Sequence, residues 1–333
     1  MSRIDVDDLG RRIIDGERLA LARGITLAES TRDDDQARAQ ALLDAVAGHT
    51  GGAVRVGLSG TPGVGKSTFI ETLGAHLTAA GKSLAVLAID PSSPTTGGSI
   101  LGDKTRMEQL SQNPRAFIRP SPSSGALGGV AAHTREALLL CEAAGFDVVV
   151  VETVGVGQSE HAVQSLTDTF VLLVAPGAGD DLQGQKRGIL DLVDVVVVNK
   201  ADGSRAIEAQ ETAAHYRNAG QLLHHGKSWV PPVLLCSSIE NRGVVEVWSA
   251  IETHRASLGD ALAQRRAQQA EQWLWRCFET ELVRRGLQHP ELRAAVAGVV
   301  ADVRSGRRSP SRAAAALAEI AMPQGGPKAA APR

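Results

Sequence analysis

Aromatic residues are scarce in this sequence, and charge of neither sign is in large excess. Phe, Trp and Tyr together make up 3 % of the 333 residues, which argues against the rows of stacking side chains that bind single-stranded nucleic acids. The formal net charge is −2, so no bulk positive field attracts a polyanion. We therefore expect no nucleic-acid partner.

Cysteine is also sparse, and long apolar runs are missing. The three cysteines, Cys141, Cys236 and Cys277, lie far apart and form no C-x-x-C pair. Neither a disulfide framework nor a thiolate metal site is therefore indicated. The N-terminal residues lack the apolar core of a signal peptide, and no run is long enough to span a bilayer. We expect a soluble, cytoplasmic protein with no membrane partner.

The chain does contain a glycine-rich phosphate-binding pattern. Residues 60–67 read Gly-Thr-Pro-Gly-Val-Gly-Lys-Ser, after the apolar segment 54–59 and before a segment, 68–77, with apolar residues at helical spacing. Strand, glycine loop and helix form a P-loop, whose backbone N–H groups and helix N-terminus attract phosphate. Lys66 is expected to reach the β- and γ-phosphates of a nucleotide, and the Ser67 hydroxyl to ligate Mg²⁺.

Two further apolar segments end in an acidic residue. Residues 83–89 lead to Asp90, and residues 146–151 lead to Glu152, three positions before Gly155. Ligands of open α/β folds bind at the carboxyl edge of a parallel sheet, so both acids are expected near the P-loop. Glu152 is a candidate to hold a metal-bound water, and the Gly155 N–H to contact a γ-phosphate.

A base-recognition pattern follows the apolar segment 194–198, where the chain reads Asn-Lys-Ala-Asp. The carboxylate of Asp202 can accept hydrogen bonds from guanine N1–H and from the exocyclic amine. Adenine has no donor at N1, so it would leave this carboxylate unpaired and is rejected. Asn199 is expected to tie the loop to the P-loop, and the aliphatic stem of Lys200 to lie over the base.

Weaker signals complete the central region. Cys236-Ser237-Ser238 follows the short apolar segment 233–235 and offers backbone N–H groups to guanine O6. Three polar, glycine-rich segments, 95–106, 119–129 and 176–187, are expected to be mobile loops. Beside a P-loop, such loops are expected to respond to the nucleotide.

Helical patterns flank this core on both sides. Residues 5–47 carry apolar stripes, and a helix from about residue 257 onward presents an apolar face of Leu274, Trp275, Phe278 and Leu282. Pro290 and Pro310 are placed at the starts of two further helices. From the residues alone, the C-terminal helices either cap the core or form a dimer seam, and a small helical appendage often needs a partner to bury such a face.

The longer motifs resemble those of the MeaB/ArgK family of P-loop GTPases. The resemblance covers about residues 5 to 320 and is carried by the runs Asp-Pro-Ser-Ser-Pro at 90–94, Gly-Asp-Lys-Thr-Arg-Met at 102–107, Arg-Pro-Ser-Pro-Ser-Ser-Gly-Ala-Leu-Gly-Gly at 119–129 and Glu-Thr-Val-Gly-Val-Gly-Gln-Ser-Glu at 152–160. Members of this family accompany adenosylcobalamin-dependent methylmalonyl-CoA mutase.

The resemblance implies a fold, a partner and a chemistry. The fold is an α/β P-loop NTPase with a mainly parallel sheet flanked by helices, an N-terminal helical extension over residues 1–50, a GTPase domain over 51–256, a C-terminal dimerisation region over 257–321 and a disordered tail over 322–333. The implied protein is a homodimer that binds GTP/GDP and Mg²⁺. It gates the loading of adenosylcobalamin onto methylmalonyl-CoA mutase and protects or reactivates that mutase.

The resemblance also implies roles for individual residues. Phosphate and Mg²⁺ would be bound by the P-loop, namely by Gly60, Pro62, Gly63, Val64, Gly65, Lys66, Ser67 and Thr68. The catalytic and metal shell would comprise Lys66, Ser67, Asp90, Asp103 and Glu152, with Gly155 on the γ-phosphate. Guanine would be bound by Asn199, Lys200, Asp202, Cys236, Ser237 and Ser238. The family usually has Ala at position 238, and because the backbone N–H contacts the base, Ser238 is expected to have little effect.

Turnover of GTP to GDP and phosphate is expected to be slow without the partner. Ras-type enzymes place a water-orienting Gln after the glycine of the second acidic motif, whereas Val156 follows Gly155 here. The loop from Gly177 to Arg187 resembles the family's extra switch, and Arg106 and Lys186 are candidates for a cationic finger.

Other functions stay open at this point. A chaperone for a different acyl-CoA mutase fits the same motifs. A nickel or zinc metallochaperone GTPase would need a cysteine- or histidine-rich tract, and His224-His225 is the single adjacent histidine pair. An adaptor with a purely structural P-loop would keep its chaperone activity in Lys66→Ala. A small-molecule kinase would need an acceptor pocket, for which no motif is seen. Older family names point to arginine and ornithine transport by a kinase or ATPase, but Asp202 argues against ATP.

Overall fold

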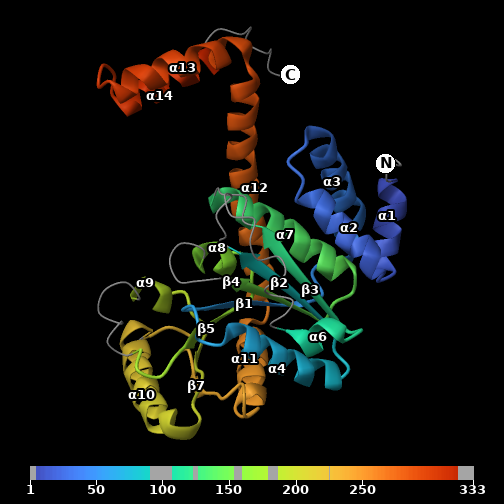
Figure 1. Ribbon diagram of the computed structural model, residues 1–333, viewed down its shortest axis with the longest axis vertical. Helices are drawn as coiled ribbons and strands as arrows, with labels where there is room; N and C mark the ends of the chain where they lie inside the picture. Colours follow the sequence, from blue (N-terminus) through green and yellow to red (C-terminus); the bar gives the residue numbers. More distant parts are fainter. Residues whose placement is uncertain are drawn as a thin grey trace. The chain divides into compact units, whose positions relative to one another are not determined.

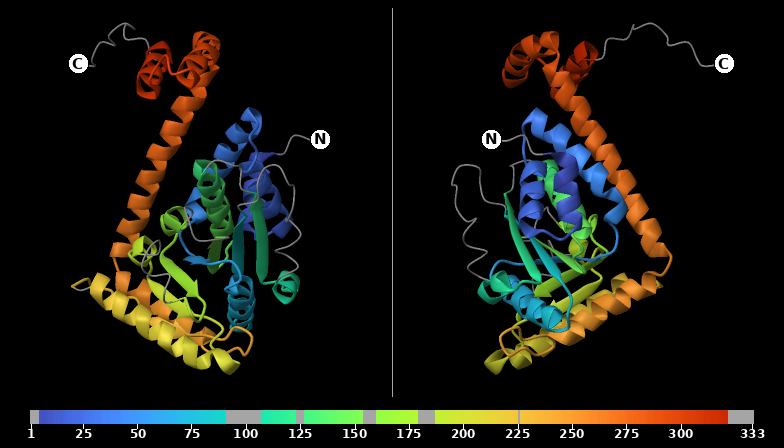
Figure 2. Two further views of the ribbon diagram at one scale, coloured as in Figure 1. Left: turned by 60° about the vertical axis from the view of Figure 1, so that its left-hand side comes forward. Right: turned by 90° about the vertical axis from the view of Figure 1, so that its right-hand side faces the viewer.

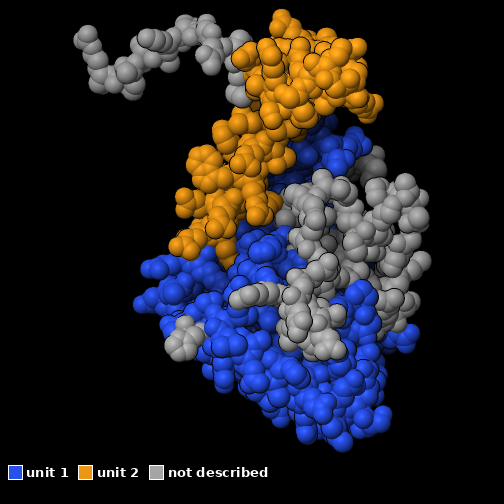
Figure 3. Space-filling model, turned by 90° about the vertical axis from the view of Figure 1, so that its left-hand side faces the viewer, with its two compact units in different colours: residues 1–266 blue, residues 267–333 orange. Residues whose placement is uncertain are grey.

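The computed structural model describes residues 5–90, 107–122, 127–153, 160–178, 187–224 and 226–321. It divides into two compact units, Met1–Arg266 and Ala267–Arg333, which are coloured separately in Figure 3. Among the described residues, no helix is long and apolar enough to cross a membrane.

The first unit is built on a seven-stranded sheet in the order β3-β2-β4-β1-β5-β6-β7. Every strand pairing within the described residues is parallel. The strands are β1 (Val54–Gly60), β2 (Leu84–Asp90), β3 (Ala116–Pro122), β4 (Val148–Thr153), β5 (Thr169–Val174), β6 (Val195–Val198) and β7 (Val233–Leu235). Near-continuous apolar runs form the inner strands β4, β5 and β6, as expected for strands of a parallel sheet that are buried on both faces. All carboxyl ends therefore lie along one edge, with β1 near the middle.

Helices cover both faces of the sheet (Figure 1). Along β2 the side chains alternate, so that Ala85 and Leu87 face one apolar core while Leu84 and Val86 face the other. The first core is covered by α7 (Leu127–Ala143), α8 (Glu160–Gln164), α9 (Arg187–Leu190) and α10 (Ala206–Leu223). The second is covered by α4 (Lys66–Ala79), α6 (Glu108–Gln112) and α11 (Val244–Leu258).

Three N-terminal helices extend the first core beyond α7. They are α1 (Val6–Ile14), α2 (Arg18–Ala28) and α3 (Asp33–Val46), and the short 3-10 turn η1 (Ala47–His49) follows them. Ile13, Ile25 and Leu42 are fully buried in the same cluster as α7 residues. Figure 2 shows these helices beside α7 in both of its views. The helical pattern predicted for residues 5–47 is confirmed.

The segment 119–129 differs from the prediction of a single loop. Residues 119–122 belong to strand β3, which the sequence reading did not anticipate, and α7 begins at Leu127, inside the segment expected to be a loop. Pro120 and Pro122 lie in β3 opposite Ala88 and Asp90 of β2. A proline has no N–H to donate to a neighbouring strand. An edge strand tolerates this because it has a neighbouring strand on one side only. The prolines therefore led to the prediction of a loop where the structure has an edge strand.

The second unit is helical. It contains most of α12 (Ala261–Gln288), together with α13 (Pro290–Arg304) and α14 (Pro310–Ala321). Pro290 and Pro310 both stand at a first helical position, where the absent N–H is not missed. Leu292 and Ala313 are the buried apolar residues of the α13–α14 pair. The three C-terminal helices expected from the sequence are confirmed.

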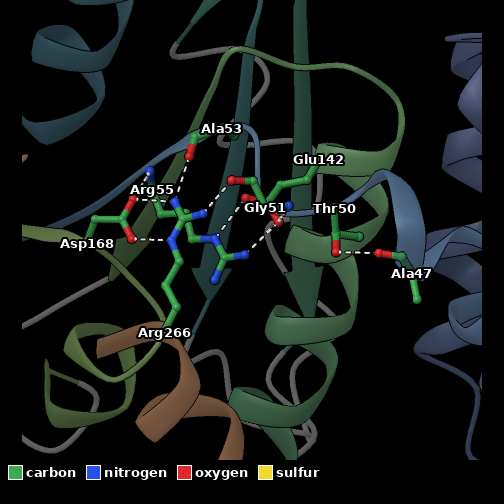
Figure 4. A network of polar contacts seen from close by, with 8 residues as sticks. All are labelled: Ala47, Thr50, Gly51, Ala53, Arg55, Glu142, Asp168 and Arg266. Atoms are coloured by element: carbon green, nitrogen blue, oxygen red, sulfur yellow. Dashed lines mark hydrogen bonds and ion pairs between the residues drawn. The ribbon is translucent and has the colours of Figure 1, made fainter. Parts of the chain in front are cut away.

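A buried ion network secures the first turns of α12 within the first unit (Figure 4). The Arg266 guanidinium donates to both carboxylate oxygens of Asp168 at 2.8 and 2.6 Å and to the carbonyls of Gly51 and Ala53. Asp168 is fully buried and also accepts from the backbone N–H of Arg55 at 3.0 Å. Arg55 in turn pairs with Glu142 of α7 at 2.8 and 2.6 Å. The network joins the starts of β1 and β5 to the C-terminal turn of α7 and the second turn of α12.

Candidate nucleotide-binding site

The P-loop joins the carboxyl end of β1 to α4. Gly65 caps α4 with φ = 96°, and a Cβ there would lie 2.7 Å from Nδ2 of Asn199. A Cβ on Gly60 would lie 2.5 Å from the Leu173 carbonyl oxygen. Both positions therefore need glycine, because neighbouring atoms leave no room for a Cβ. Gly65 also needs it for its left-handed backbone conformation. The loop consequently turns tightly into α4, and backbone N–H groups at the N-terminus of this helix are placed to bind an anion.

Lys66, the first residue of α4, folds back over this loop. Its Nζ donates to the Gly60 carbonyl at 2.8 Å and lies 3.4 Å from the Thr61 carbonyl. The residue is 7 % exposed. Burial lowers the pKa of its ammonium group, and the charge of Glu152 opposes this shift. Ser67 is half-buried and Thr68 exposed on the next positions of the helix.

Glu152 lies near the end of β4, the strand beside β1. It is 6 % exposed and close enough to Lys66 to influence the charge there. The next residue, Thr153, donates its hydroxyl hydrogen to Ser59 Oγ at 2.9 Å, which joins the ends of β4 and β1. A carboxylate and the Ser67 hydroxyl are oxygen donors of the kind that Mg²⁺ prefers, so these residues fit that ion chemically.

Several predicted residues cannot be placed. The backbone of Asp90 ends β2, one strand beyond β4, but its side chain is not described. Asp103, Arg106, Gly155, Val156 and Lys186 lie outside the described residues, as do the segment 95–106 and most of the segment 176–187. Within the described parts of the chain, no cluster of three or more His, Cys, Asp or Glu residues is able to hold a metal.

The loop after β6 contacts the P-loop directly. The Asn199 side-chain amide donates to the Val64 carbonyl at 3.0 Å, as the sequence reading expects. Lys200 has φ = 59°, in the left-handed region that favours glycine, and its Nζ donates to the Gly63 carbonyl at 2.5 Å. Two side chains from one loop thus hold two successive P-loop carbonyls. The loop that carries the predicted base-recognition motif is therefore in direct contact with the P-loop.

Asp202 is held in place from the loop after β7. The Ser237 hydroxyl donates to Asp202 Oδ2 at 2.5 Å and accepts from the Glu240 N–H at 3.1 Å. The backbone N–H of Ala201 donates to the Cys236 carbonyl at 3.0 Å. Arg242 adds a bond to the Ala201 carbonyl at 2.6 Å. The carboxylate that would read guanine is therefore fixed by a neighbouring loop.

Sequence reasoning missed four supporting groups. It assigned Ser237 and Ser238 a role through their backbone N–H groups, whereas both hydroxyls also bond to the motif residues. Thr72 of α4 lies 2.9 Å from the Ser238 carbonyl, and Arg242 contacts Ala201. Short polar side chains next to a motif give no sequence signal of their own, because their partners come from distant parts of the chain.

Comparison with known proteins agrees with this geometry. Residues 21–291 match the family model described as "Methylmalonyl Co-A mutase-associated GTPase MeaB". The chain is 48 % identical over 276 residues to "GTPase ArgK" of Escherichia coli K12, a match that covers 82 % of this chain and 83 % of the relative. It is 44 % identical over 322 residues to "Methylmalonic aciduria type A homolog, mitochondrial" of Mus musculus, with 93 % and 78 % covered.

A solved structure supports the fold. The crystal structure of the LAO/AO transport system kinase matches with a TM-score of 0.74 and 36 % sequence identity, over 96 % of this chain and 99 % of that one. The central parallel sheet and the P-loop after β1 are thus those of a P-loop NTPase. The chain is therefore a GTP hydrolase and belongs to the MeaB family of methylmalonyl-CoA mutase-associated GTPases.

Proposed function

We propose that this protein is a GTP-driven chaperone of an adenosylcobalamin-dependent methylmalonyl-CoA mutase. GTP binding and hydrolysis gate the loading of adenosylcobalamin onto the mutase and protect or reactivate it. The observation that carries the nucleotide part is the pair of hydrogen bonds by which Asn199 and Lys200, in the same loop as Asp202, hold two carbonyls of the P-loop. The link to the mutase is supported by the family match and by the printed names of the relatives.

In this proposal the residues of the two loops bind the two halves of the nucleotide. The P-loop residues Gly60, Pro62, Gly63, Val64 and Gly65 surround the phosphates, and Ser67 and Thr68 meet them at the start of α4. Asp202 accepts from the guanine edge while the Lys200 stem lies over the ring. Cys236, Ser237 and Ser238 close the pocket near guanine O6. The two motifs are already joined, so little rearrangement is needed before the nucleotide binds.

The catalytic roles are placed at the end of the sheet. Lys66 is buried beside the P-loop carbonyls and carries the charge that stabilises the transferred phosphoryl group. Glu152, with Asp90 and Asp103, is assigned to orient water and the metal shell. Bound Mg²⁺ would neutralise phosphate charge, with Ser67, Asp90 and Glu152 as the residues that hold it. Intrinsic turnover is slow because no Gln stands at position 156.

We also propose that the chain works as a homodimer through its C-terminal helices. The division into a helical extension up to residue 50, a GTPase domain up to 256, a dimerisation region up to 321 and a tail belongs to this proposal. Its support is the row of exposed apolar residues on α12, namely Leu274, Trp275, Phe278, Leu282, Val283 and Leu287.

Co-elution with a methylmalonyl-CoA mutase from the same organism tests the proposal. The purified proteins are mixed with GDP or with a non-hydrolysable GTP analogue, and GTP turnover is measured alongside. We expect a complex in at least one nucleotide state and faster turnover when the mutase is present. A GTPase that neither binds the mutase nor responds to it contradicts the proposal, and a response to another acyl-CoA mutase instead would reassign the client.

A further inference from the structure

The Ser238 side chain lies at the junction of the base loop and the P-loop. Its Oγ donates to the Asn199 Oδ1 at 2.9 Å, and its backbone N–H lies 3.3 Å from the same oxygen. Ser238 is 6 % exposed and Asn199 2 % exposed. Burial raises the pKa of the nearby Cys236 thiol to about 11. The serine hydroxyl is thus enclosed among groups of the site.

These contacts determine which way the Asn199 amide faces. Its oxygen receives both Ser238 donors, which leaves the NH₂ group to face the Val64 carbonyl at 3.0 Å. If the amide turned over, its NH₂ group would face the Ser238 backbone N–H, which is also a donor, and the Val64 carbonyl would face an oxygen, while the Ser238 hydroxyl would have to rotate to accept instead of donate. Without the hydroxyl, the Asn199 oxygen would keep only the longer bond from the Ser238 backbone N–H, and the amide would be held less firmly.

The orientation matters because Asn199 packs against the turn of the P-loop. Its Nδ2 occupies the space that a Cβ on Gly65 would need, at 2.7 Å. Val64 is 1 % exposed, so its carbonyl has no water to replace a lost donor. A rotated amide would leave that carbonyl unpaired and loosen the loop that surrounds the phosphates.

We propose that the Ser238 hydroxyl is a positioning group for nucleotide binding: it fixes the Asn199 amide, which in turn fixes the P-loop. This inference rests on the guanine-nucleotide site proposed above. It differs from the sequence-based expectation that only the Ser238 backbone N–H matters. The hydroxyl acts on the phosphate side of the site, whereas the neighbouring Ser237 hydroxyl acts on the base through Asp202.

The two adjacent serines provide a matched test. Dissociation rates of fluorescent GDP and of fluorescent inosine diphosphate, which lacks the exocyclic amine, are measured for wild type, Ser238→Ala and Ser237→Ala. We expect Ser238→Ala to speed release of both nucleotides by about fivefold, an effect of one lost hydrogen bond, and to keep their ratio unchanged. Ser237→Ala is expected to reduce the preference for GDP over inosine diphosphate. Ser238→Thr, which keeps the hydroxyl, is expected to restore slow release.

The outcomes separate this inference from the proposed function. Wild type that binds neither GDP nor GTP would refute the proposed function. Wild type that binds GDP, with Ser238→Ala releasing both nucleotides at the wild-type rate, would overturn the positioning role alone. A changed ratio of the two release rates in Ser238→Ala would also overturn it, because the serine would then act on the base.

Discussion

At the scale of residues, Asp202 is the proposed determinant of nucleotide choice. A carboxylate accepts two hydrogen bonds, and Ser237 holds one of its oxygens at 2.5 Å. Guanine presents two donors to such a group. Xanthine replaces the exocyclic amine by a carbonyl, so it would place an acceptor against a carboxylate oxygen and be repelled.

Asp202→Asn is therefore expected to exchange the preferred base. The amide offers one acceptor to N1–H and one donor to the xanthine carbonyl, so xanthosine diphosphate should bind more tightly than GDP. We expect GDP affinity to fall at least about a hundredfold, in line with sites built around buried hydrogen bonds. Titration calorimetry with both nucleotides measures this, and Asp191→Asn at a half-exposed aspartate is the control. Unchanged GDP affinity in Asp202→Asn would show that Asp202 does not contact the base.

Residues differ in how far the sequence reveals their role. The P-loop glycines and Asp202 belong to local patterns whose backbone geometry or base chemistry dictates the residue type, so the sequence predicts them. Ser238 and Thr72 owe their contacts to the loop after β7, which comes close to α4 and to the loop after β6, and nothing in their local sequence indicates this. Tertiary packing decides which polar side chains support a motif.

At the scale of elements, the strands that could be predicted are those in the middle of the sheet. Four consecutive valines in β4 and in β6 have little alternative to a strand buried on both faces. The edge strand β3 carries Arg119, Pro120 and Pro122 and lacks that signal. This segment is a strand because it pairs with β2, and a pairing between distant segments leaves no signal in the local sequence.

Two ion pairs of α12 illustrate how burial changes the loss of stability when the arginine of a pair is removed. Arg266 and Arg285 stand on the same helix, and each bonds to a carboxylate with a shortest distance of 2.6 Å. The Arg266 side chain is 15 % exposed and its partner Asp168 is fully buried, whereas the Arg285 side chain is 73 % exposed and its partner Glu281 38 % exposed. Removing the cation of a buried pair leaves a buried carboxylate without a partner. This destabilises the protein far more than removing the cation of a solvent-exposed pair.

Arg266→Met is accordingly expected to lower the free energy of unfolding by about 3 kcal/mol. The matched control Arg285→Met should cost less than about 1 kcal/mol. Urea unfolding followed by circular dichroism compares the two variants with wild type. Equal effects in both variants would mean that the network of Figure 4 adds nothing beyond a surface pair.

At the scale of the whole molecule, the two units have different surfaces. The first encloses two apolar cores around its sheet. In the second, α12 keeps Leu274, Trp275 and Phe278 at 62, 57 and 49 % exposure, with the Trp275 and Phe278 rings edge to face at 5.9 Å. A row of exposed large apolar residues on one helix marks a surface that gains stability when another molecule covers it. This is why a second copy of the chain was proposed as its partner.

Trp275→Glu is expected to prevent that association. A carboxylate in the middle of an apolar interface must lose its hydration without a partner, so the dimer should give way to a monomer. Size-exclusion chromatography with light scattering gives the mass, and Gln272→Glu adds the same charge at an exposed polar position of α12 as a control. If the wild type is a dimer, and the dimer persists in Gln272→Glu but is lost in Trp275→Glu, the interface lies on the apolar face of α12. A dimer that survives Trp275→Glu would place the interface elsewhere, and a monomeric wild type would remove the homodimer from the proposed function while leaving the nucleotide site as it is.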